Sequence, residues 1–119
     1  MKRLTDPLDA LATIEAEHAR RTHGPDYASH HEGFGVLAEE VQETADELRT
    51  MQRHVEYLLR VVRAGDDNGV RLTLAAIRWV AIAAAAECMQ VAAVAEKWIS
   101  SDVNAVINNN DDNDEEQED

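Results

Sequence analysis

The fold is decided by residues 34–64, FGVLAEEVQETADELRTMQRHVEYLLRVVRA. Apolar side chains recur in this stretch at steps of three and four residues, the spacing of one face of an α-helix. They are Phe34, Leu37, Ala38, Val41, Ala45, Leu48, Val55, Leu59 and Val62. We therefore predict a long helix over about residues 32–64. Gly33 and Gly35 weaken its first turn, which is tolerable where the backbone must approach another group closely.

Two more helices are predicted around this one. Asp6 and Pro7 are typical of a helix start, and the segment 23–25, His-Gly-Pro, is typical of a helix end. Glycines and Asx residues at 65–69 predict a turn, and a third helix should follow over about residues 70–100. With 45% hydrophobic but only 4% aromatic residues, the chain should be all-α, an antiparallel helical bundle built around two long helices.

The run from Trp79 to Ala95 is apolar except for Glu87 and Gln90. It approaches the length of a membrane span, but it contains these two polar residues and is mostly alanine, which contributes little to membrane insertion. We interpret it as a buried helix, with a transmembrane helix as the alternative, and expect Trp79 and Trp98 to be packing anchors. Small residues all round a helix predict burial on several sides, so we expect a homodimer or homotetramer to complete the bundle.

Composition limits the classes of function. Of the formal net charge of −13, seven negative charges lie in residues 108–119, which leaves −6 for the rest. Such acidity argues against nucleic-acid binding. We expect one domain over residues 1–107 and a disordered acidic tail over residues 108–119. Cys88 is the only cysteine, and Asp6, Pro7 and Asp9 interrupt any export signal, so a reducing, cytoplasmic location is expected.

Two pairs of polar residues could bind a metal ion. Glu40 and Glu43 are three residues apart and so share one helical face. Glu87 and Gln90 repeat this spacing, and an ionised Glu87 within an apolar helix is costly unless a cation or donor compensates it. If the two long helices pair in antiparallel fashion, three carboxylates and one amide oxygen could converge, a ligand set suited to magnesium or manganese. Glu39, about 100° round the helix from Glu40, could support a second ion or orient a water molecule.

Other interpretations of these residues remain open. The acidic group could be the solvated side of an amphipathic helix. Glu87 could instead be paired with Arg53 or Arg78, or be protonated and hydrogen-bonded to a neighbour.

The segments HEGFGVLAEEVQE (31–43) and ECMQVAAVA (87–95) resemble the small MazG-like proteins of phages and bacteria. These belong to the all-α nucleoside triphosphate pyrophosphohydrolases, whose pattern is EExxE followed at a distance by ExxD. The resemblance implies an oligomeric bundle that binds Mg²⁺ and a nucleoside triphosphate and releases a nucleoside monophosphate and pyrophosphate.

Position by position, Glu40 and Glu43 match the first ligand pair of that pattern and Glu87 matches the first acid of the second pair. Gln90 stands where the family usually has aspartate, and an amide oxygen coordinates a hard cation without bringing charge. We expect Glu39 to position or deprotonate the attacking water. The alternative is a non-catalytic helical module with the same fold that engages a protein partner through its acidic surface.

Overall fold

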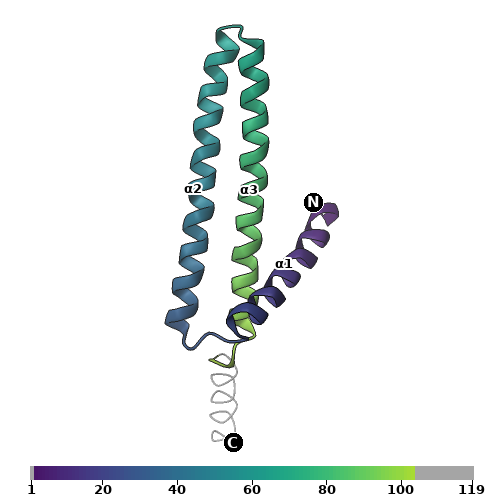
Figure 1. Cartoon of the computed structure of the whole chain (residues 1–119), viewed down its shortest axis with the longest axis vertical. Coiled ribbons are helices and arrows are strands. Elements are labelled where there is room, and N and C mark those ends of the chain that lie inside the picture. The colour runs from purple at the N-terminus through teal and green to yellow at the C-terminus, as the bar shows by residue number, and fades with distance from the viewer. Residues whose placement is uncertain (1, 104–119) are drawn as a thin grey trace, which may run out of the picture. The chain divides into compact units, whose positions relative to one another are not determined.

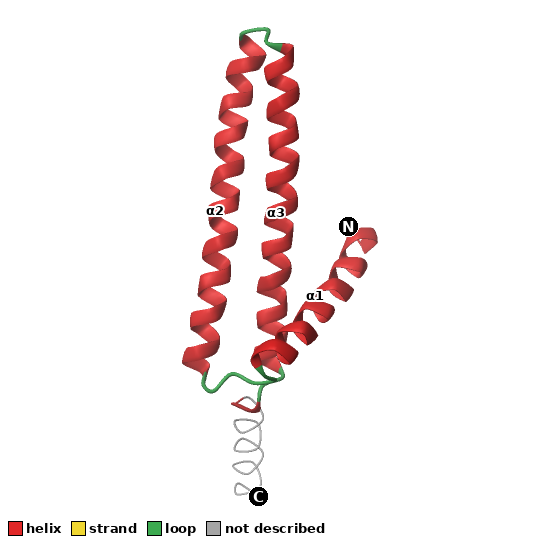
Figure 2. Cartoon of the chain, viewed as in Figure 1, coloured by secondary structure: helices red, strands yellow, loops and turns green. Residues whose placement is uncertain are grey.

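The computed structural model describes residues 2–103. It contains α1 (Lys2–His23), α2 (His30–Arg63) and α3 (Asp67–Ile99), joined by short loops (Figures 1 and 2). No strand occurs within residues 2–103, so the predicted all-α class is confirmed. The predicted tail at 108–119 lies outside the described residues.

All three helices begin a few residues earlier than the sequence predicted. Helix α1 begins at Lys2, so Pro7 lies inside it and the prediction that the helix starts at Asp6 was wrong. A proline so close to the N-terminus removes only one helical hydrogen bond, to the carbonyl of Arg3, and the helix tolerates this loss. The predicted end of α1 is confirmed at His23, and Gly24 follows with φ of 90°, a conformation that favours glycine.

The turn between α2 and α3 is shorter than predicted. Gly65 has φ of 66°, and Asp66 then caps α3 by accepting a hydrogen bond from the Gly69 amide (2.9 Å). Gly69 therefore lies in the first turn of α3, and a Cβ at this position would collide with the Asp66 carboxylate. The glycine that was predicted to belong to the turn instead makes room for the helix cap.

The described residues form two compact units. We call Glu40–Cys88 the hairpin unit, and the described parts of Met1–Glu39 and Met89–Asp119 the terminal unit. Helices α2 and α3 each contribute to both units. Glu40 and Cys88 therefore mark where each long helix passes from one unit to the other.

In the terminal unit, small side chains of α1 and α3 form the core together with the loop that follows α1. Its buried apolar residues are Ala12, Ala16, Tyr27, Ala93 and Val94. The buried Ser101 hydroxyl accepts a hydrogen bond from the Tyr27 amide (3.0 Å) and donates one to the Lys97 carbonyl (3.0 Å). The Lys97 ammonium lies 4.3 Å from the centre of the Tyr27 ring, a cation–π contact. These contacts fix the loop before α2 against the end of α3.

Trp98 is a packing anchor of the terminal unit. Its indole Nε1 donates a hydrogen bond to His30 Nδ1 (2.9 Å), and its ring lies against Gly33. A Cβ at Gly33 would come within 2.8 Å of the Trp98 ring. This close approach explains why a glycine stands in the first turn of α2.

Gly33→Ala should therefore destabilise the protein, whereas Gly35→Ala should not. Alanine normally stabilises a helix interior by roughly 1 kcal/mol relative to glycine, but at Gly33 the clash with Trp98 should produce a net loss of about 1–3 kcal/mol. A Cβ at Gly35 would meet nothing within 4 Å, so Gly35→Ala is the matched control and should show the gain. Urea unfolding of both variants measures the difference, and equal stabilities would contradict the packing described for Trp98.

The hairpin unit is two antiparallel helical segments, Glu40–Arg63 of α2 and Asp67–Cys88 of α3, connected by the tight turn. Each segment turns one face to the other at steps of three and four residues. On α2 the buried or partly buried positions on this face are Glu40, Thr44, Glu47, Met51, His54, Leu58 and Val61, and on α3 they include Val70, Thr73, Ile77, Val80, Ala84 and Glu87. The interface is thus apolar near the turn and acidic at the opposite end.

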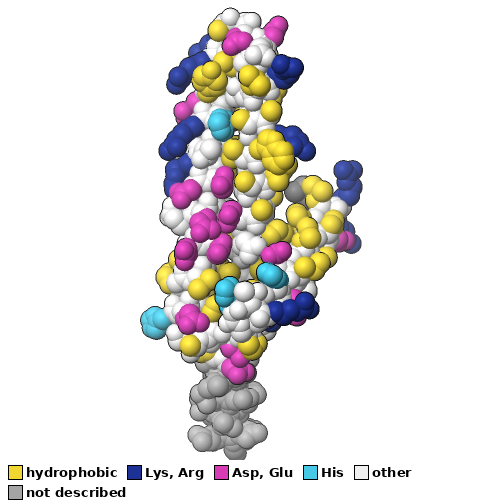
Figure 3. All heavy atoms as spheres, in the orientation of Figure 1, with side chains coloured by type: hydrophobic (Ala, Val, Ile, Leu, Met, Phe, Trp, Pro, Cys, Tyr) yellow, Lys and Arg dark blue, Asp and Glu magenta, His cyan; other side chains and the backbone are white. Residues whose placement is uncertain are grey.

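Much of the apolar surface of α3 is open to solvent in the single chain. Only 11% of its most apolar 18-residue window is buried, and Trp79 is 65% exposed. Trp79 is therefore not a packing anchor within one chain, because in the hairpin unit α3 has only α2 as a neighbour; the burial of α3, which was expected to need a second copy of the chain, stays a prediction. Apolar side chains are accordingly visible on the surface in Figure 3. By length and composition α3 could also cross a membrane, but one such helix is weak evidence for a transmembrane protein.

Candidate metal centre

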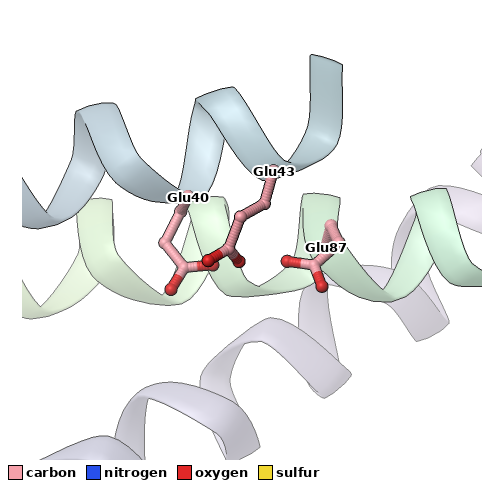
Figure 4. Close-up of side chains that lie close together, drawn as sticks. All are labelled: Glu40, Glu43 and Glu87. Carbon is pink, nitrogen blue, oxygen red and sulfur yellow. The ribbon is translucent and has the colours of Figure 1, made fainter. Parts of the chain in front are cut away.

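Three carboxylates meet at the acidic end of the hairpin unit. Each of Glu40, Glu43 and Glu87 offers an oxygen, and these oxygens all lie within 4.8 Å of one another. Figure 4 shows the two side chains of α2 converging with that of α3. Glu40 and Glu87 are partly buried and Glu43 is exposed, so the cluster is accessible to small ions from solvent.

The local structure explains why these residues converge. Glu40 and Glu43 are about one helical turn apart and point to the same side of α2. Glu87 occupies the face of α3 that packs on α2, one turn after the buried Ala84. The pairing of the two helices, set by the short turn at Gly65, therefore brings residues from distant parts of the sequence into one cluster.

The carboxylates disfavour one another's charge. The pKa of Glu87 is raised above the usual value for a glutamate, first by loss of solvent, next by a hydrogen bond that its protonated form shares with Glu43, and then by the charges of Glu43 and Glu47. A hydrogen bond with Glu40 acts in the opposite direction but is the smallest of these effects. A cation placed among these oxygens would favour the ionised form of Glu87 and offset the repulsion from Glu43 and Glu47, which adds to the effect of desolvation.

Within residues 2–103, no arginine is paired with Glu87. The ion pairs of this part of the chain are Arg20–Glu17 and Arg49–Asp46. The guanidinium of Arg78 lies 5.6 Å from the centre of the Trp79 ring instead. The sequence-based alternative of a Glu87–arginine pair is thus not observed, while the alternative of a protonated Glu87 hydrogen-bonded to a neighbour fits the raised pKa.

Asp46 lies close to the cluster in sequence but has its own partners. Its carboxylate is paired with Arg49 and accepts a hydrogen bond from Gln42 (3.1 Å). The hydrogen bond from Arg49, followed by that from Gln42, lowers the pKa of Asp46. Asp46 is therefore charge-compensated within α2, whereas the charges that act on Glu87 are negative.

The other two predicted site residues, Glu39 and Gln90, belong to the other compact unit of the chain. Glu39 is exposed and belongs to the terminal unit. Gln90 also belongs to the terminal unit, where its amide nitrogen donates a hydrogen bond to the Glu15 carboxylate of α1 (2.9 Å). The sequence analysis missed Glu15 as the partner of Gln90, and it missed the effect of Glu47 on Glu87. The seven-residue spacing from Glu40 to Glu47 was the available signal for Glu47, because residues at this spacing share one face of a helix.

The donor set fits a hard divalent cation. Mg²⁺ binds oxygen at about 2.0–2.1 Å and Ca²⁺ at about 2.3–2.6 Å, so opposite ligands are separated by roughly 4–5 Å. The 4.8 Å limit on the carboxylate oxygens matches opposite ligands of Ca²⁺, and small side-chain rotations would bring the oxygens to the roughly 4.2 Å that opposite ligands of Mg²⁺ allow. An all-carboxylate set without histidine or thiolate favours magnesium or manganese over zinc.

Comparison of the chain with models of known protein families, with curated proteins and with solved structures found no match. The geometry alone describes the site, as a cluster of the Glu40, Glu43 and Glu87 carboxylates on an α-helical hairpin.

Proposed function

We propose that the protein is a magnesium-dependent nucleotide pyrophosphohydrolase of the MazG-like class, which cleaves a nucleoside triphosphate to a nucleoside monophosphate and pyrophosphate. One observation carries the proposal: Glu40, Glu43 and Glu87, the three residues that match the EExxE and ExxD pattern, have oxygens within 4.8 Å of one another.

The charge of the protein supports a substrate that arrives with a cation. A polyphosphate would be repelled by three carboxylates on a chain of net charge −13 unless a divalent ion bridged them. When bound, magnesium supplies charge neutralisation at the phosphate oxygens, and Mn²⁺ would serve in the same way. Binding such an ion also removes the repulsion at Glu87, so site and cofactor compensate each other's charge.

In this proposal Glu40, Glu43 and Glu87 hold the ion and fix the position of the triphosphate. Glu39 orients or deprotonates the attacking water, whose oxygen bonds to the α-phosphorus while the bond to the β-phosphate oxygen breaks and pyrophosphate leaves. Gln90 acts as a weaker fourth ligand. Its hydrogen bond to Glu15 uses only the amide nitrogen, so the carbonyl oxygen keeps its lone pairs for a cation.

The direct test is a substrate panel. The purified full-length chain is incubated with canonical and modified nucleoside triphosphates and Mg²⁺ or Mn²⁺, and pyrophosphate and monophosphate are quantified. We expect the two products in equal amounts for at least one nucleotide and none with a chelator present. Failure to release pyrophosphate from any nucleotide at any enzyme concentration would reject the proposal.

A second candidate is a non-catalytic helical module that binds a protein partner. The exposed apolar surface of the hairpin unit favours it, since a single chain leaves ten large apolar side chains open there. This candidate predicts no stabilisation by divalent ions, and the metal titration argued in the Discussion separates the two functions.

A further inference from the structure

One hydrogen bond in the terminal unit joins α1 to a predicted site residue of α3. The side-chain nitrogen Nε2 of Gln90 donates to the carboxylate oxygen Oε2 of Glu15 at 2.9 Å. Both residues are partly buried, and they lie 75 positions apart in the sequence. Neither of the ion pairs within residues 2–103 involves Glu15. The Glu15 carboxylate is instead held by the amide of Gln90.

The chemistry of this bond fixes the orientation of the Gln90 amide. An ionised carboxylate accepts hydrogen bonds but does not donate them, whereas an amide has an oxygen that accepts and a nitrogen that donates. The amide therefore turns its nitrogen towards Glu15, which leaves its oxygen on the other side. A hydrogen bond to a charged acceptor is stronger than one between neutral groups, and it polarises the amide so that more negative charge collects on the oxygen.

A fixed orientation matters when an amide binds a metal ion. A hard divalent cation is coordinated by the oxygen of the amide and not by its nitrogen. The last torsion of glutamine is roughly two-fold, so a freely rotating side chain presents the wrong atom about half of the time. Both terminal atoms of a glutamate are oxygens, and it needs no such orientation. Removing a group that orients a metal ligand typically lowers metal affinity by about 10–100-fold.

We propose that Glu15 is a positioning residue of the metal centre, which holds the Gln90 amide so that its oxygen is available to the cation. This inference rests on the proposed function, in which Gln90 is the fourth ligand, three residues after Glu87 on α3. It also gives a reason for an uncharged residue at position 90. A carboxylate there would lie against that of Glu15, and the two like charges would repel each other.

The affinity of the full-length chain for Mg²⁺, measured by isothermal titration calorimetry, tests this role. Glu15→Ala removes the acceptor, so the dissociation constant for Mg²⁺ should rise about 10-fold. Glu15→Gln keeps an oxygen that accepts from Gln90, and it should recover most of the affinity despite the lost charge. Glu17→Ala is the matched control, because it removes the same charge from the same helix, where Glu17 is paired with Arg20. Its dissociation constant should stay within about twofold of the wild-type value, since the charge of a distant, exposed side chain is screened.

A double-mutant cycle separates positioning from a purely structural role of Glu15. In a Gln90→Glu background the ligand has oxygens at both terminal positions, so orientation by Glu15 is no longer needed. Adding Glu15→Ala to Gln90→Glu should therefore leave Mg²⁺ binding undiminished. Without metal it should raise the melting temperature relative to Gln90→Glu, because it removes the repulsion between two carboxylates. A structural role predicts the same loss of affinity in both backgrounds. Circular dichroism establishes that each variant is folded.

The outcomes distinguish this inference from the proposed function. A Glu15→Ala protein that binds Mg²⁺ as tightly as the wild type would overturn the role of Glu15 and leave the metal centre intact. So would an equal loss of affinity in the wild-type and Gln90→Glu backgrounds, or a loss in Glu17→Ala as large as that in Glu15→Ala. A wild-type chain that does not bind Mg²⁺ at all would overturn both the positioning role and the metal centre.

Discussion

Glu87→Gln is expected to reduce pyrophosphate release at least about 100-fold, the scale seen when a group that stabilises transition-state charge is removed. The substitution keeps the shape of the side chain and its oxygen but removes a negative charge from the centre of the cluster. Glu40 and Glu43 are then left with two charges to hold a divalent ion instead of three. The loss should be partly overcome by raising the Mg²⁺ concentration, which measurements of kcat/KM across a Mg²⁺ series would show.

Glu96→Gln is the control for this prediction. Glu96 is a partly buried glutamate of α3 that lies outside the cluster and in the terminal unit. Its substitution changes the net charge by the same amount and should leave kcat/KM nearly unchanged. A Glu87→Gln protein as active as the Glu96→Gln protein would show that Glu87 does not hold the cation, and the proposed site would be wrong.

The long helices and the meeting of the glutamates could be predicted from the sequence because both depend on local periodicity. The repeat over residues 34–64 predicts α2 to within two residues at its start and one at its end. Glu40 and Glu43 share a face in any helix, and a hairpin with a short turn must bring Glu87 back along α2. These inferences need only helical geometry and the position of one turn.

Other features depended on side-chain packing that no periodicity reveals. The start of α3 at Asp67 follows from the cap by Asp66, which needs the room left by Gly69. The hydrogen bond between Gln90 and Glu15 joins residues 75 positions apart, and nothing in the local sequence of either indicated it. The exposure of Trp79 likewise reflects the absence of a third helix in the hairpin unit, a property of the topology.

Magnesium should raise the melting temperature of the protein, and the rise should grow with pH. Because the pKa of Glu87 is raised in the folded protein, the folded state holds this proton more tightly than the unfolded chain does. The resulting stabilisation is complete in acid, below the usual glutamate value of 4.5, and is lost as the pH rises through the raised pKa. Above that pKa the metal-free protein carries uncompensated repulsion, which Mg²⁺ removes by binding the ionised cluster.

At a hundredfold excess of Mg²⁺ over its Kd, binding should stabilise the folded state by about 2.7 kcal/mol, which for a chain of this size is a rise in Tm of roughly 10 °C. Scanning calorimetry at pH 4.5 and pH 8, with and without Mg²⁺, measures the effect.

The Glu87→Gln variant should lose most of the Mg²⁺-induced rise in melting temperature. Without metal it should melt above the wild type at pH 8, since it lacks the repelling charge. Glu96→Gln should behave as the wild type does. An identical Mg²⁺ response in the Glu87→Gln and wild-type proteins would place the ion elsewhere, and no response in either would favour the protein-binding module over the enzyme.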